Sequence, residues 1–228
     1  MPAIIMAAGV GSRISRHVDK PKCLLEIEGK SILRRTVEML AQNGVQSIVV
    51  TGYQHALIEE NLKDVDVTLL NNPFFRVTNS LGSLWFARDY IRDDEELYLM
   101  NADVFWQQDI FDILKEEARD VLLLADSSIA RLEGGDYFGV SDNKIVKYGK
   151  ELAREIRTHE YVGVGRIRPA FLPPFRKMLH TLMEAEQYTS WWEDVLYQLS
   201  TDYDVFVRDV AGHFWAEVDY IEDYERIM

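Results

Sequence analysis

The chain has 228 residues, of which 47% are hydrophobic, and this is enough to bury one substantial core. It carries 25 Lys and Arg against 38 Asp and Glu, and the net charge of −13 argues against general binding to nucleic acid or to anionic membranes. The single cysteine, Cys23, permits no internal disulfide, and the apolar segment 4–8 is shorter than a signal peptide and lacks its basic leader. We therefore expect a cytoplasmic protein without membrane insertion.

Over residues 1–126, apolar β-branched runs alternate with segments of helical periodicity. This alternation predicts an α/β fold with a Rossmann-like, mainly parallel sheet and crossover helices. The expected strands are about 3–6, 46–51, 65–70, 96–100 and 121–125. One expected helix begins at Ser31 as N-cap and ends at Asn43-Gly44, a second covers 55–62, a third begins after Thr78 or Asn79, and a fourth covers 110–118.

After about residue 126 the pattern changes. Two short β-rich runs, 137–141 and 144–148, flank Asp142-Asn143, which is typical of a hairpin turn. Further strands are expected at 161–167, 204–207 and 213–218, and helices at about 170–186, up to Leu199, and at the end of the chain. The second half therefore predicts a small antiparallel addition to the sheet. The sequence has no repeat and no linker rich in Gly, Ser or Pro, so we expect a single domain over 1–228.

The first expected strand runs into a loop with two glycines, Gly9 and Gly11, followed by Arg13 and later by Lys22. Glycine tolerates positive φ and close backbone approach, so consecutive N–H groups of such a loop can face an anion. The two cationic side chains would add mobile positive charge, which suits a polyphosphate. The spacing fits neither G-x-x-x-x-G-K-[ST] nor G-x-G-x-x-G, because position 14 is Ile. A purely structural strand-to-helix turn is the alternative.

Two acidic residues stand where expected strands end. Asp103 follows the strand at 96–100, and Asp219 follows the strand at 213–218. Open α/β sheets bind ligands at the carboxyl ends of their strands, and Mg²⁺ prefers one or two carboxylates together with phosphate oxygens. Both residues are therefore candidate Mg²⁺ ligands, with helix or turn capping as the alternative. The histidines are scattered without the spacing of zinc ligands.

A family resemblance is carried by the N-terminal string Ala7-Ala8-Gly9-Val10-Gly11-Ser12-Arg13 and by Pro21-Lys22. It resembles the A-A-G-x-G-[ST]-R…P-K signature of nucleotidyltransferases that join a nucleoside triphosphate to a sugar phosphate or a small alcohol phosphate. Later segments, Trp191-Trp192-Glu193-Asp194 and Glu217-Val218-Asp219, look most like bacterial CTP:phosphocholine cytidylyltransferases. Relatives often carry an acid where Asn101 stands, so this chain departs from the pattern there.

The resemblance implies a role for each matching residue. Asp103 and Asp219 would hold Mg²⁺, Lys22 would contact the α-phosphate and Arg13 the β- and γ-phosphates. Cytosine as the base is likewise implied by the resemblance. The expected nucleotide contacts come from the glycine loop and from the turn at 79–83: Ala7, Ala8, Gly9, Gly11, Ser12, Asn79, Ser80 and Ser83.

Aromatic residues crowd the sequence near the second acidic motif, beside several carboxylates. Aromatic faces with a nearby carboxylate bind quaternary ammonium groups, whereas simple core packing is the alternative for each ring. We expect the following residues to bind the acceptor: Tyr188, Trp191, Trp192, Glu193, Trp215 and Glu217.

The leading hypothesis is a Mg²⁺-dependent cytidylyltransferase that transfers CMP from CTP to phosphocholine or a similar amino-alcohol phosphate or phosphonate and releases pyrophosphate. Its catalytic residues would be Arg13, Lys22, Asp103 and Asp219. Segment 1–126 would form the nucleotide-binding core, and 127–228 the acceptor-binding and sheet-completing part. The alternatives are a sugar-1-phosphate nucleotidyltransferase and a non-catalytic nucleotide-sensing module, and the sequence leaves the oligomeric state open.

Overall fold

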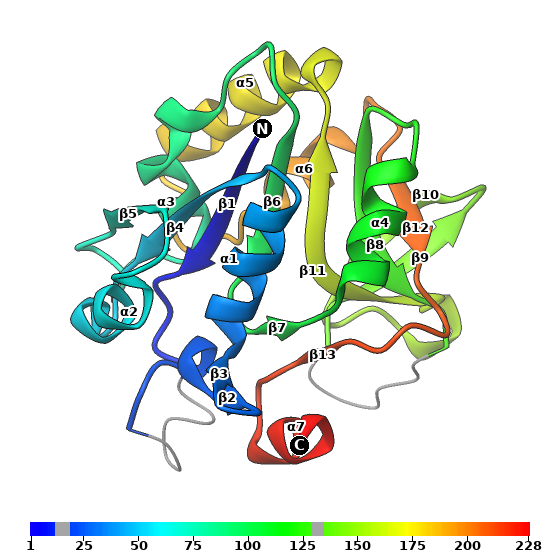
Figure 1. Cartoon of the computed structure of the whole chain (residues 1–228). Coiled ribbons are helices and arrows are strands. Elements are labelled where there is room, and N and C mark those ends of the chain that lie inside the picture. Colours follow the sequence, from blue (N-terminus) through cyan, green and yellow to red (C-terminus); the bar gives the residue numbers. More distant parts are fainter. Residues whose placement is uncertain (12–18, 129–134) are drawn as a thin grey trace.

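The computed structural model describes residues 1–11, 19–128 and 135–228, and one nine-stranded sheet runs through all three segments (Figure 1). The strand order is β5-β4-β1-β6-β11-β8-β12-β10-β9. Its first part is a parallel block of β1 (Pro2–Ala7), β4 (Gln46–Thr51), β5 (Val67–Asn71) and β6 (Leu97–Asn101). All residues of β1 are buried, because the strand lies inside the sheet and helices cover both of its faces.

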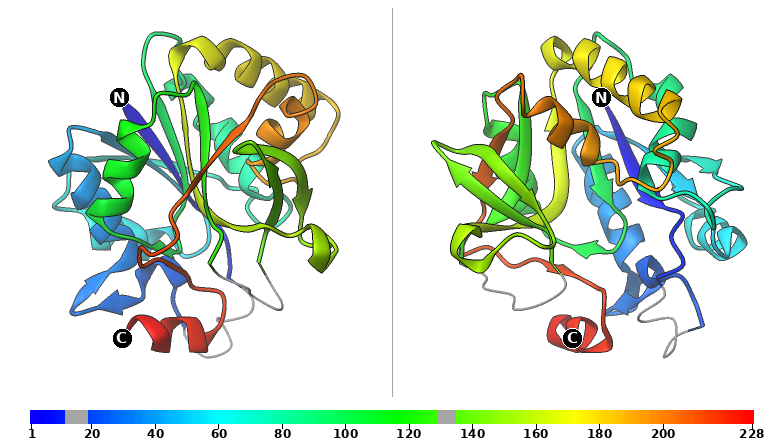
Figure 2. Two further views of the ribbon diagram at one scale, coloured as in Figure 1. Left: turned by 90° about the vertical axis from the view of Figure 1, so that its right-hand side faces the viewer. Right: turned by 180° about the vertical axis from the view of Figure 1, so that it is seen from behind.

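Helices form a layer on each face of the sheet (Figures 1 and 2). One face carries α1 (Ile32–Gln42), α2 (His55–Leu62) and α4 (Gln108–Glu116), and the other carries α3 (Ser80–Phe86), α5 (Leu172–Glu184) and α6 (Asp194–Leu199). Side chains alternate along β1, so Ile4 faces the second layer and Ile5 the first. As predicted, the Ser31 hydroxyl caps α1 by accepting a hydrogen bond from the Arg34 N–H at 3.1 Å.

The second half of the chain completes the sheet in an order that the sequence did not predict. Strand β8 (Val121–Asp126) is separated from β6 by β11 (His159–Ile167), which runs antiparallel to both. Strand β12 (Phe206–Asp209) then pairs parallel to β8, and the hairpin of β9 (Tyr137–Ser141) and β10 (Lys144–Gly149) ends this side. The α/β fold with a parallel core and an antiparallel addition is confirmed. The addition, however, enters the middle of the sheet.

Short elements complete the chain. The two-residue strands are β2 (Glu26–Ile27), β3 (Lys30–Ser31), β7 (Val104–Phe105) and β13 (Ala216–Glu217), the 3₁₀ turns are η2 (Lys22–Leu24), η3 (Arg88–Tyr90), η4 (Arg154–Ile156) and η5 (Pro169–Phe171), and the last helix is α7 (Ile221–Ile227). The strand expected at 213–218 is thus only β13, which pairs with β7 just beyond β6. No helix in the described residues is long and apolar enough to cross a membrane.

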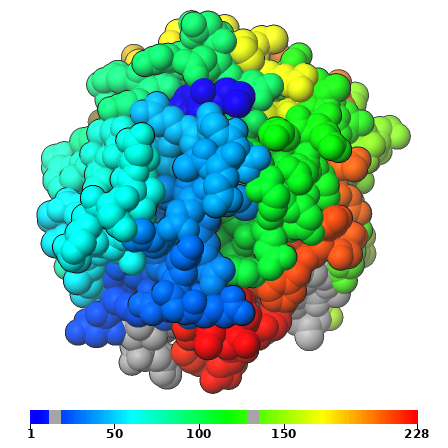
Figure 3. All heavy atoms as spheres, in the orientation of Figure 1, coloured from blue at the N-terminus to red at the C-terminus, as the bar shows by residue number. Residues whose placement is uncertain are grey.

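The C-terminal helix α7 lies beside the segment around β2, at the end of the molecule opposite the N-terminus (Figures 1 and 3). Leu25 and Ile27 share a small buried cluster with Val218, and the Tyr224 hydroxyl donates a hydrogen bond to the carbonyl oxygen of Glu26. This packing holds the segment after β13 next to the segment that begins at Lys22. It therefore brings two of the predicted site residues together from opposite ends of the sequence.

Candidate active site

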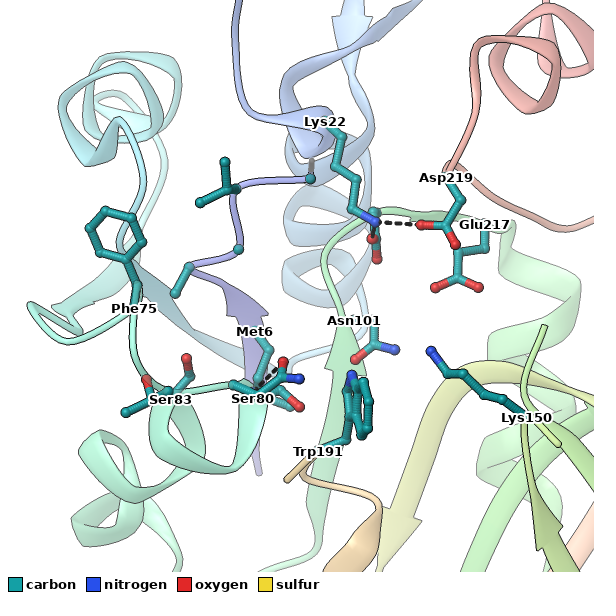
Figure 4. Close-up of a pocket in the computed structure, with 17 residues that line it drawn as sticks. Met6, Lys22, Phe75, Ser80, Ser83, Asn101, Lys150, Trp191, Glu217 and Asp219 are labelled. Carbon is teal, nitrogen blue, oxygen red and sulfur yellow. Dashed lines mark hydrogen bonds and ion pairs between the residues drawn. The ribbon is translucent and has the colours of Figure 1, made fainter. Parts of the chain in front are cut away.

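A cavity of about 440 Å³ opens at the carboxyl ends of β1 and β6, where an open α/β sheet usually binds its ligand (Figure 4). Residues from both halves of the chain line it. They are Met6, Ala8, Gly9, Val10, Gly11, Lys22, Phe75, Thr78, Asn79, Ser80, Ser83, Asn101, Asp103, Lys150, Trp191, Glu217 and Asp219.

The side chain of Lys22 lies between two carboxylates in this cavity. Its Nζ is 2.8 Å from Asp219 Oδ1 and forms a second ion pair with Asp103 Oδ2. Burial alone would lower the pKa of the Lys22 ammonium, but the charges of Asp103 and Asp219 outweigh it and raise this pKa above its ordinary value. Lys22 is therefore charged at any physiological pH, and the structure brings three of the predicted catalytic residues into contact.

A third carboxylate, Glu217, belongs to the same cluster. Oxygen atoms of Asp103, Glu217 and Asp219 all lie within 4.8 Å of one another. Burial, reinforced by the charges of Asp103 and Asp219, raises the pKa of Glu217 to about 8. At neutral pH Glu217 therefore favours its protonated form.

The donor set of this cluster fits Mg²⁺. Carboxylate oxygens are the ligands that this ion takes from proteins, and one or two of them suffice when phosphate oxygens and water complete the shell. Asp103 lies two residues past the end of β6 and Asp219 two residues past the end of β13, and both carboxylates line the cavity. Asp103 and Asp219, together with Glu217 beside them, could hold the ion.

The glycine loop after β1 forms another part of the wall. Ala8, Gly9 and Gly11 line the cavity, whereas Ala7 is buried in the core. Gly11 has φ of +61°, and a Cβ added there would lie 3.2 Å from the Lys22 Cδ. Gly9 does not have a positive φ, and a Cβ there would meet no atom within 4 Å, so its side faces open space. The predicted contacts from Ser12 and Arg13 lie outside the described residues.

The start of α3 supplies the opposite wall with Asn79, Ser80 and Ser83. This turn is tied to the segment after α5. The Asn79 N–H donates to the Tyr188 carbonyl at 2.9 Å, and the Trp192 N–H donates to the Ser80 hydroxyl at 2.8 Å. The nucleotide contacts expected from α3 and the acceptor contacts expected from 188–192 therefore sit on one connected piece of structure.

The predicted acceptor residues divide into two groups. Trp191, which is 45% exposed, and Glu217 line the cavity. Trp192 and Trp215 do not, because both are core residues, 0% and 2% exposed, with indole N–H groups that donate to Asn101 at 3.0 Å and to Asp126 at 2.8 Å. The expectation that these two rings offer a face to the acceptor is corrected. Tyr188 is half exposed but is not among the lining residues.

Glu193 lies directly behind the cavity wall. It is 5% exposed, its Oε1 accepts a hydrogen bond from Asn101 Nδ2 at 3.3 Å, and its Oε2 has no partner among the described residues. Burial raises the pKa of Glu193 well above its ordinary value. The wall residue Asn101 is therefore fixed from behind by Glu193 and Trp192.

Sequence reasoning missed three polar residues of the cavity, Thr78, Asn101 and Lys150. Lys150 comes just after β10, and no motif distinguishes it among the basic residues of the chain. Its Nζ lies 4.6 Å from the centroid of the Trp191 ring and 3.6 Å from Asp136 Oδ2. The cavity thus has a second ammonium group, on the side away from the glycine loop.

Comparison with known proteins gives the class of this chain. Residues 3–169 match the family described as MobA-like NTP transferase domain, and the chain belongs to that family. It is therefore a nucleotidyltransferase, in agreement with a glycine loop and an acidic cluster that line one cavity.

Two relatives have names that specify the nucleotide or the acceptor that they use. A choline-phosphate cytidylyltransferase of Haemophilus influenzae is 41% identical over 49% of this chain, and the alignment spans about half, 47%, of that protein. A CTP:phosphoglutamine cytidylyltransferase of Campylobacter jejuni is 25% identical over 99% of this chain and 98% of its own.

Among solved structures, the CTP:phosphocholine cytidylyltransferase of Streptococcus pneumoniae superposes with a TM-score of 0.81 at 19% identity, covering 99% of this chain and 96% of that one. The inositol-1-phosphate CTP transferase of T. maritima has a TM-score of 0.76 at 24% identity, with 99% and 94% coverage. These structures share the fold.

Proposed function

We propose that this chain is a Mg²⁺-dependent cytidylyltransferase that transfers CMP from CTP to a small amino-alcohol phosphate or phosphonate, such as phosphocholine, and releases pyrophosphate. The Lys22 ammonium, held between Asp103 and Asp219 on the cavity wall, is the observation that carries this conclusion. Transfer between two polyanions requires alignment and charge neutralisation above all, and this cluster supplies both. The named activities of the relatives support CTP as the donor and a small phosphorylated acceptor.

The proposed reaction needs no strong general base. A phosphate monoester is largely dianionic near pH 7, since its second pKa is about 6, so an acceptor oxygen can attack the α-phosphorus of CTP directly. The bond from that phosphorus to the bridging oxygen breaks, and pyrophosphate leaves. Mg²⁺ held by Asp103 and Asp219 would neutralise phosphate charge and orient the transferred group.

Different side chains of the cavity would bind the triphosphate, the base and ribose, and the acceptor. Lys22 can donate hydrogen bonds to the α-phosphate region from a position fixed by its two ion pairs. The N–H groups around Gly9 and Gly11 can face the triphosphate, and Asn79, Ser80 and Ser83 can bind the base and ribose. On this view residues 1–126 bind the nucleotide, and Trp191, Glu217 and Lys150 from the second half face the acceptor.

The test is a substrate panel with pyrophosphate as the readout. Purified protein is incubated with CTP or UTP, Mg²⁺ and one acceptor at a time: phosphocholine, phosphoethanolamine, 2-aminoethylphosphonate or glucose 1-phosphate. We expect pyrophosphate with CTP and an amino-alcohol phosphate or phosphonate, a CMP-linked product by ³¹P NMR, and no reaction in excess EDTA.

Two outcomes of the same panel favour the alternatives. Turnover restricted to glucose 1-phosphate would identify a sugar-1-phosphate nucleotidyltransferase. CTP binding without pyrophosphate release from any acceptor would identify a nucleotide-sensing module.

A further inference from the structure

The Lys150 ammonium occupies a cation site within the cavity. It lies over the face of Trp191, 4.6 Å from the ring centroid, with the Asp136 carboxylate 3.6 Å away. Figure 4 shows the two side chains entering from different elements with their ends close together beside Asn101. An aromatic face with a carboxylate at its side is also how proteins bind the ammonium group of a ligand. Lys150 therefore lies where a cationic acceptor head would bind best.

The surroundings of this cation site are acidic. The Asp194 carboxylate accepts a hydrogen bond from the backbone N–H of Trp191 at 2.8 Å, so it is held at the backbone of the same residue. Burial raises the pKa of Asp136 above its ordinary value, the Lys150 ammonium opposes this rise, and the charge of Asp194 adds to it. The Lys150 ammonium thus compensates the negative charge of Asp136 and Asp194, and the cationic group of a ligand could compensate the same charge.

The attachment of Lys150 at this site is weak. A distance of 3.6 Å to Asp136 is longer than a direct hydrogen bond, and the Lys150 side chain is 38% exposed. Its Nζ faces the Asp136 carboxylate and the Trp191 ring, and the four-carbon stem of lysine is flexible. Lys22 and Asp103 line the same cavity, so a displaced Lys150 would stay among groups that face phosphate.

We propose that Lys150 fills the subsite of the acceptor's ammonium head in the unliganded protein, and that the acceptor displaces it toward the reacting phosphates. This inference rests on the proposed function, because it takes an amino-alcohol acceptor. Displacement would couple recognition of the head group to delivery of a positive charge at the phosphates. A phosphate without a cationic head would leave Lys150 on Trp191 and would be a poor acceptor for that reason.

The first test measures binding of choline, which has the head group but no phosphate. Isothermal titration compares the wild type with Lys150→Met and with the control Lys147→Met, which removes an exposed lysine of the preceding strand β10 that does not line the cavity. If the subsite is free in about one molecule in ten, Lys150→Met binds choline about tenfold more tightly. Lys147→Met should show no such change, and the uncharged analogue 3,3-dimethylbutan-1-ol should bind every variant more weakly than choline, because it lacks the cationic head.

The second test measures turnover of phosphocholine. Lys150→Met should lower kcat on the order of a hundredfold, since one phosphate-facing charge is lost. A gain in head-group affinity together with a loss of turnover is not expected of a merely structural residue. In a Trp191→Leu background, where the shared face is absent, Lys150→Met should no longer tighten choline binding.

Unchanged or weaker choline binding by folded Lys150→Met would overturn the displacement of Lys150, whatever the activity of the wild type. Failure of the wild type to transfer CMP to any acceptor would instead overturn the proposed function. The two failures are therefore told apart by separate measurements.

Discussion

Gly52 lies where a side chain has no room, so a substitution there should affect both the stability of the protein and its activity with CTP. It follows β4, and an added Cβ would lie 2.8 Å from each of three atoms: Ala8 Cβ, the Ala8 carbonyl oxygen and Phe75 Cβ. Ordinary contacts of this kind begin at 3.4 Å, so the neighbours must move by about 0.6 Å, which is 3.4 minus 2.8 Å. None of the three atoms is the end of a flexible side chain. Ala8 and Phe75 both line the cavity.

We expect Gly52→Ala to lower the free energy of unfolding by about 1–3 kcal/mol, as overpacking of a dense site usually does. A shift of this size at Ala8 should also lower kcat/KM for CTP, by roughly tenfold to a hundredfold, because the loop that faces the triphosphate is misplaced. Urea unfolding followed by tryptophan fluorescence measures the first effect, and pyrophosphate release at varied CTP concentration measures the second.

Gly9→Ala is the comparison, because a Cβ at Gly9 would meet no atom within 4 Å. Its free energy of unfolding should stay within about 0.5 kcal/mol of the wild type. Wild-type stability and wild-type KM for CTP in Gly52→Ala would show that the close packing of β4 against the loop does not position Ala8.

Three further changes test other parts of the site. Asp103→Asn should lower kcat by at least about a hundredfold, because a proposed metal ligand and an ion-pair partner of Lys22 are lost. The exposed control Asp66→Asn should keep full activity, and equal activity of the two variants would refute the role of Asp103. Glu193→Gln should stabilise the protein more at pH 9 than at pH 5. The folded-state pKa of Glu193 is raised above the ordinary 4.5, so the contribution of Glu193 to stability falls as pH rises from 4.5 toward that folded-state pKa. Urea unfolding is measured for the variant and the wild type at both pH values, and an equal difference in unfolding free energy at the two would contradict this reasoning. Trp215→Phe should lower the free energy of unfolding, measured in urea, with little effect on the KM for the acceptor, because the ring packs in the core and its N–H donates to buried Asp126. A rise in that KM at unchanged stability would instead indicate that Trp215 contacts the acceptor.

Local signals in the sequence were sufficient for much of the fold. Helices α1 and α2 and strand β4 lie where apolar periodicity, the Ser31 cap and the Asn43-Gly44 stop predicted them. The meeting of Lys22, Asp103 and Asp219 was predicted too, from the motifs that resemble the nucleotidyltransferase signature. The sheet-edge rule applies directly only to Asp103, which follows β6, because Asp219 follows β13, and β13 pairs with β7 outside the main sheet. The insertion of β11 between β6 and β8 was not, since strand order depends on long-range pairing that leaves no local pattern.

The acceptor side of the cavity was harder to predict from residue types. Trp191 and Trp192 are adjacent in the sequence, yet one lines the cavity and the other is fully buried, because successive side chains leave the backbone in different directions. A count of aromatic residues near a motif cannot separate these two cases. Lys150 was missed for the opposite reason, since a lone lysine after a hairpin strand is ordinarily a surface residue.

The position of β11 decides how the chain could be divided. Strand β8 reaches β6 only through β11, so a fragment that stopped at Asp126 would carry β8 with no neighbour on either side and would expose the long edge of β6. The family match ends at residue 169, two positions past the last residue of β11. Fusion or complementation experiments that treat the N-terminal half as a portable module should therefore fail unless they also supply this strand.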